Sequence, residues 1–112
     1  YTLALQNRRL KEARKYAELA LNFAPEQASI LDTLGYIAFL QNDFDTAVKV
    51  LGQAYEISQN VNIGIRYAKA LYMQGALTQF SDVLHQLKQK HVNAPQLQQL
   101  DDLILPVTVK KS

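Results

Sequence analysis

The sequence predicts an all-α fold built from consecutive antiparallel helix pairs, and three observations predict it. Leu (17) and Ala (13) make up more than a quarter of the 112 residues, against four Gly and three Pro, which favours helices over turn-rich β folds. Apolar residues recur every three or four positions along most of the chain. The pattern also repeats about every 33 or 34 residues. The length fits one domain or a piece of one.

The repeat is visible in four columns of residues that keep this spacing. The columns are Leu10, Phe44 and Leu77; Ala13, Ala47 and Phe80; Ala20, Ala54 and Leu87; and Gly35, Ala68 and Asp101. Each unit of this length carries two helical patterns. The sequence therefore predicts a solenoid, in which each unit buries its apolar face against its neighbours.

The first unit, residues 1–25, is predicted to be partial. Residues 1–6 are interpreted as the tail of a first helix, and a second helix carries the apolar residues from Leu10 to Ala20 until Ala24-Pro25 closes it. Tyr1 is not an initiator Met. We therefore expect a processed or excised fragment, from which an upstream signal or anchor could be missing.

Two complete units follow, at 26–59 and 60–93. In the first, Asn42 and Asp43 interrupt the helical spacing, and Asp43 is suited to cap the second helix. In the second, Gln74-Gly75 predicts the turn. Pro95 is expected to open a last capping helix over 95–105, which carries Leu97, Leu100 and Ile104, before a tail at 106–112.

The middle unit resembles the tetratricopeptide repeat (TPR) signature. The segments Asp32 to Tyr36 and Gln41 to Ala47 carry the resemblance, and the signature columns are filled by Leu31, Leu34, Gly35, Ala47, Leu51 and Ala54. Small residues there allow two helices to approach closely. Asp101 takes the Gly column of the last helix, so we expect no partner helix after it and a polar-backed cap instead.

A narrower resemblance is carried by residues 30–36 and by Tyr67-Ala68. These phrases are similar to the C-terminal repeats of bacterial TPR lipoproteins linked to exopolysaccharide export and PEP-CTERM sorting. This resemblance implies a periplasmic or membrane-anchored location through a missing upstream segment. Without it, a cytoplasmic location is the expectation.

The family resemblance implies where binding residues lie, because the first helix of each TPR pair lines a concave groove. Its groove columns fall on Asp32, Tyr36, Phe39, Leu40, Ile65, Arg66, Lys69, Tyr72 and Met73, with Thr2, Leu5 and Gln6 upstream. Aromatic rings beside cations suit a peptide with acidic groups. The alternative is that Phe39 and Tyr72 only pack between repeats. The family's carboxylate clamp is not matched, since Asp32, Tyr36, Ile65 and Lys69 occupy its positions.

The predicted function is a non-catalytic scaffold that binds a protein or peptide. One alternative is a structural end of a longer superhelix in an envelope or exopolysaccharide-export system, with the binding site upstream. Another is a regulatory domain whose enzyme has been removed. No catalytic, phosphate-binding or membrane-spanning pattern is present, and we expect no cofactor.

Other candidate sites have simpler interpretations. The basic run Arg8, Arg9, Lys11, Arg14 and Lys15 is interrupted by acids and is interpreted as a solvated helix face, not a nucleic-acid site. His85 and His91 have the wrong spacing for a metal site and are interpreted as surface residues.

The predicted N-terminal end also has a consequence for association. The helix that carries Leu10, Ala13, Ala17 and Ala20 lacks a complete partner helix, so apolar area is left exposed there. We expect weak homodimerisation through that end, as a result of truncation.

Overall fold

The structure, a computed structural model, describes the backbone of residues 2–102 and the side chains of residues 8–102. It contains five α-helices and a short 3-10 helix: α1 (Thr2–Phe23), α2 (Ala28–Leu40), α3 (Phe44–Ser58), α4 (Val61–Gln74), α5 (Leu77–Lys90) and η1 (Pro95–Leu97). Residues 98–102 continue helically after η1, and we call 95–102 the C-terminal helix. No strand occurs among residues 2–102. The all-α prediction is confirmed.

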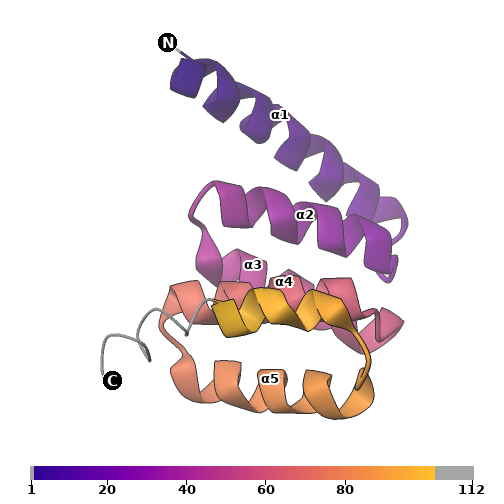
Figure 1. The fold of residues 1–112 in the computed structure, drawn as a ribbon. Helices are drawn as coiled ribbons and strands as arrows, with labels where there is room; N and C mark the ends of the chain where they lie inside the picture. The colour runs from indigo at the N-terminus through magenta and orange to yellow at the C-terminus, as the bar shows by residue number, and fades with distance from the viewer. Residues whose placement is uncertain (1, 103–112) are drawn as a thin grey trace.

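The helices stack one after another (Figure 1). α1 packs on α2, α2 on α3, α3 on α4 and α4 on α5. In addition, α4 contacts α2 and η1, so α4 lies at the centre of the described array. This is the neighbour-on-neighbour packing of a helical solenoid. The pair α2–α3 falls within 26–59 and the pair α4–α5 within 60–93.

Each tight turn between helices has a local cause. Asp43 accepts a hydrogen bond from the backbone N–H of Thr46 and so caps α3. The Asn60 side chain accepts from the N–H groups of Asn62 and Ile63 and caps α4. Gly75 ends α4 with φ of 90°, a left-handed conformation that glycine adopts without strain. The turns predicted at Asn42-Asp43 and Gln74-Gly75 are therefore confirmed.

The closest helix approach in the middle unit is between α2 and α3. A Cβ atom added at Gly35 would lie 2.6 Å from Leu51 Cδ2, closer than van der Waals contact allows. Ala38, Ala47 and Leu51 are fully buried around this point. The small-residue columns of the repeat therefore act as predicted.

The next pair achieves the same approach with a different glycine. Phe80 and Leu87 occupy columns of α5 where small residues are expected, and both are buried. Space for Leu87 comes from α4, where a Cβ at Gly64 would lie 2.6 Å from Leu87 Cδ2 and 2.8 Å from Tyr55 Cε1. In this pair the small residue, Gly64, therefore lies on the first helix and faces a large residue of the second.

One prediction about helix organisation is wrong. The sequence predicts a helix tail over 1–6 followed by a separate helix, but α1 is a single helix from Thr2 to Phe23. The stretch between these two parts, Gln6-Asn7-Arg8-Arg9, contains no Pro or Gly, so nothing stops helical hydrogen bonding there. As a result, Thr2, Leu5 and Gln6 do not belong to a separate first helix, and their side chains lie outside the described residues.

The basic run on α1 is also not entirely a solvated face. Arg8, Arg9, Lys11 and Lys15 are exposed, as predicted. The side chain of Arg14 is instead only 25% exposed and donates to Gln41 Oε1 at 2.8 Å, with Asp43 Oδ2 at 3.0 Å. Arg14 therefore fastens α1 to the turn between α2 and α3, a contact across 27 and 29 residues of sequence that no local pattern shows.

We predict that Gly35→Leu lowers the free energy of unfolding by about 1–3 kcal/mol, because the added side chain overpacks the α2–α3 contact. Leucine has the higher helix propensity, so on an open helix face this change would stabilise. Gln53→Leu, on an exposed position of α3, is the matched control and should leave the midpoint of chemical denaturation unchanged or raised. Equal stability of Gly35→Leu and the parent would contradict the packing described here.

We predict that the Asp43 contacts give stability that depends on pH. Hydrogen bonds from Thr46, and then the hydrogen bond and charge of Arg14, lower the pKa of Asp43 below its ordinary value of 3.8. A lowered folded pKa contributes stability that is fully present above 3.8 and is lost as the pH falls through the folded pKa. Asp43→Asn keeps a capping side chain and removes the charge. Denaturation at several pH values should show the parent more stable at neutral pH and the two proteins converging in acid.

Candidate functional site

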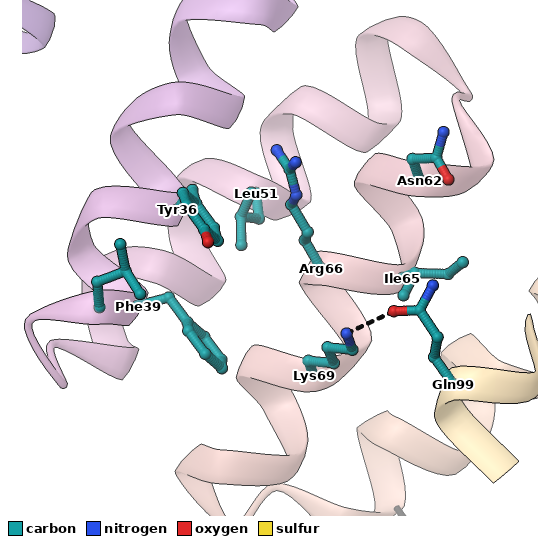
Figure 2. Close-up of a pocket in the computed structure, with 9 residues that line it drawn as sticks. Tyr36, Phe39, Leu51, Asn62, Ile65, Arg66, Lys69 and Gln99 are labelled. Carbon is teal, nitrogen blue, oxygen red and sulfur yellow. Dashed lines mark hydrogen bonds between the residues drawn. The ribbon is translucent and has the colours of Figure 1, made fainter. Parts of the chain in front are cut away.

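A groove of about 480 Å³ opens between α2, α4 and the C-terminal helix (Figure 2). Sites that take small ligands or single side chains occupy about 300–1,000 Å³. Leu51 and Ile65 are buried at its floor. Its remaining lining consists of Tyr36, Phe39 and Leu40 from α2, Asn62, Arg66 and Lys69 from α4, and Gln99 from the C-terminal helix. We call this the concave groove.

The helices that line this groove are repeated elements, which explains why their side chains converge. α2 and α4 are the first helices of two successive pairs, and the C-terminal helix follows α5 in the corresponding place. Helices at equivalent places in a solenoid lie side by side, and one face of each is left for solvent. Tyr36 and Leu40 on α2 are each 46% exposed for this reason.

An ion pair and a stacked ring define one side of the groove. Arg66 Nη1 donates to Asp32 Oδ2 at 2.6 Å, joining α4 to α2. The guanidinium of Arg66 lies 4.9 Å from the centre of the Tyr36 ring, within the range of a cation–π contact. Asp32 therefore compensates the charge of Arg66 and holds it against the ring.

Lys69 stands on the other side with a different partner. Its Nζ atom donates to Gln99 Oε1 at 2.6 Å (Figure 2). Gln99 is neutral, and none of the described ion pairs includes Lys69. No acidic residue lines the groove. Lys69 therefore leaves a positive charge in the groove that no described carboxylate compensates, next to an apolar floor.

The structure brings together most of the residues that the family resemblance implied. Six line the concave groove, and Asp32 lies beside it through its pair with Arg66; the six are Tyr36, Phe39, Leu40, Ile65, Arg66 and Lys69. Tyr72 does not line it; its ring packs against that of Phe80, with ring centres 5.2 Å apart and ring planes inclined at 59°. Met73 is 51% exposed and also lies outside the lining.

Three lining residues are absent from the sequence-based set. Leu51 is a second-helix residue that reaches the floor because Gly35 has no side chain to cover it. Asn62 lies one turn before Arg66 on α4, and helical spacing from Arg66 would have pointed to it. Gln99 belongs to the C-terminal helix, whose role as a wall depends on tertiary packing.

Other candidate sites carry little chemistry in the described part of the chain. His85 is exposed and His91 is half-buried at the end of α5. Within residues 2–102, no group of three or more His, Cys, Asp or Glu side chains could hold a metal ion. Over the same range, no helix combines the length and the apolar character needed to cross a membrane.

Comparison with known proteins identifies the fold. The tetratricopeptide repeat family matches residues 38–101, more than half of the chain, across α3, α4 and α5. No curated protein matches the chain. These comparisons do not support the narrower resemblance to exopolysaccharide-export and PEP-CTERM lipoproteins. The family match and the stacked antiparallel helix pairs agree, and the chain belongs to the tetratricopeptide repeat family.

Proposed function

We propose that this chain is a non-catalytic scaffold that binds a peptide segment of a partner protein in the concave groove. Tetratricopeptide repeats generally mediate protein–protein interaction. The observation that carries the proposal is the uncompensated charge of Lys69 above an apolar floor, within one groove lined by α2, α4 and the C-terminal helix. The favoured peptide carries an acidic group beside an aromatic or aliphatic side chain.

The chemistry of the groove supports this pairing. An apolar side chain would bury area against Leu51, Ile65 and Phe39. A carboxylate of the peptide would replace Gln99 as the partner of Lys69, exchanging a bond to a neutral amide for a charge-assisted one. Arg66 is already held by Asp32, so we expect it to contribute its position and its hydrogen-bonding edge more than free charge.

A structural role is the second candidate function. Leu97 and Leu100 are buried, while Gln98 and Asp102 are exposed on the same helix. Such a helix, apolar inside and polar outside, would close a longer superhelix whose binding site lies elsewhere. Assigning that superhelix to an envelope or exopolysaccharide-export system would rest only on the resemblance carried by residues 30–36 and Tyr67-Ala68.

We predict that panning a random peptide library displayed on phage against this chain enriches sequences with Asp or Glu near an aromatic or aliphatic residue. Tyr36→Ala/Lys69→Glu should weaken the selected peptides by at least about tenfold, because it removes a wall and inverts the charge. Tyr36 is 46% exposed and Lys69 half-buried, so the helices should remain folded, which circular dichroism checks.

Lys49→Glu is the matched control, because Lys49 is an exposed lysine of α3 that does not line the concave groove. It changes the net charge as Lys69→Glu does and should leave peptide affinity unchanged. Selected peptides that bind the groove variant as tightly as the parent would place the site elsewhere. Absence of any enrichment would favour the structural role.

A further inference from the structure

A second groove, unrelated to the concave one, lies between α1 and α2. It encloses about 480 Å³ and has no charged residue in its lining. We call it the α1–α2 groove, and it is lined by Ala13, Tyr16, Ala17 and Ala20 from α1 and by Ser29, Ile30, Thr33 and Ile37 from α2. An open, mostly apolar and uncharged groove between two helices suits an apolar helix face.

The internal repeat identifies the shape of what fits this groove. Adding 34 to the four α1 residues gives Ala47, Val50, Leu51 and Ala54 of α3. Those residues face α2, because a Cβ atom on Gly35 of α2 would meet side-chain atoms of Val50 and Leu51. Ala47 and Ala54 are fully buried. The repeat relates α1 to α3, and α2 packs on α3. The surface of α3 that α2 covers therefore corresponds to the surface of α1 that the α1–α2 groove leaves open. By this repeat relation, the groove presents the surface on which a helix packs in the following unit.

The chain itself presents a matching helix face on α1. Tyr16, Leu19 and Phe23 are 72%, 55% and 90% exposed, and their spacing of three and four puts them on one face of α1, beside Ala13 and Ala20. In the other described helices the exposed large apolar residues do not form such a run apart from the pair in the concave groove, Tyr36 and Leu40. Alanines at the seam permit a close helix approach, as they do between α2 and α3.

The charge distribution along α1 selects the direction of the partner helix. Residues 8–15 contain five Lys or Arg and one Glu, whereas the remainder of α1, residues 16–23, contains Glu18 and no Lys or Arg. Two α1 helices side by side in parallel would place their basic halves together. In an antiparallel arrangement each basic half faces Glu18 and the negative end of the helix dipole of the other copy.

We propose that two copies of this chain associate through a two-fold axis at α1, with α1 of each copy lying antiparallel in the α1–α2 groove of the other. A two-fold contact uses the same patch twice, which fits a groove and a helix face that adjoin on one surface. This dimer does not involve the concave groove, so it stands independently of the peptide-binding proposal.

Sedimentation equilibrium over a concentration series tests the dimer. The parent is expected to show a reversible monomer–dimer equilibrium. Leu19→Lys/Phe23→Lys should weaken it by at least about tenfold, since the two added cations would face the basic half of the other copy's α1. Ile57→Lys/Leu77→Lys makes the same change at residues 51% and 58% exposed on α3 and α5 and should leave it unaltered. A parent that is monomeric up to its solubility limit overturns the proposal, as does a dimer that the α1 variant leaves intact.

Disulfide crosslinking gives a second measurement that does not depend on losing an interaction. The chain contains no Cys, so a single substitution reports one position. Tyr16→Cys lies close to the two-fold axis when residues 8–15 face residues 16–23, so it should form a disulfide-linked dimer under mild oxidation. Gln53→Cys, an exposed residue of α3, should not. Failure of Tyr16→Cys to crosslink in a solution where the parent is dimeric would show that another surface or register forms the dimer.

Discussion

The close approach of α2 and α3 at Gly35 is the constraint on which the rest of the array depends. The side chain of Leu51 packs directly against the backbone of Gly35 and occupies the volume that any side chain at position 35 would need. In the next pair Gly64 leaves room for the side chains of Leu87 and Tyr55 in the same way. Close packing at these two glycines allows α2, α4 and the C-terminal helix to lie side by side. The concave groove follows from that alignment, and its floor includes Leu51 itself. The contact between Gly35 and Leu51 therefore contributes both to the packing of α2 on α3 and to the floor of the concave groove.

Much of the fold could be predicted because its determinants are local. Asp is a residue type that commonly caps helices, so the sequence alone indicates the role of Asp43 before α3. Gly is the residue type that most readily adopts the left-handed conformation found at the end of α4, at Gly75. The repeat spacing allowed each unit to support the interpretation of the next. The same reasoning reached Tyr36, Arg66 and Lys69, since residues that recur on one face of equivalent helices meet on one side of a solenoid.

What could not be predicted depends on contacts between distant segments. The continuity of α1 was missed because a repeat pattern implies a helix boundary even where no residue stops the helix. The role of Arg14 was missed because Gln41 and Asp43 become its partners only after α1 packs on α2. Tyr72 occupies a repeat position that the family resemblance places in the concave groove. Its ring instead packs against Phe80, which stands where the repeat predicts a small residue. In each case tertiary packing decided the outcome.

We infer that the stability of the array is highest around the α2–α3 contact and falls toward α1. Native-state hydrogen exchange measured amide by amide tests it most directly, because it reports the free energy of opening at each position. We expect the slowest amides in α2 and α3 near Ala38, Ala47 and Leu51, where side chains are fully buried. Faster exchange is expected in α1, which in the described structure packs mainly on α2 and is fastened to the α2–α3 turn by Arg14. Amides of α1 that exchange as slowly as those around Leu51 would contradict this account.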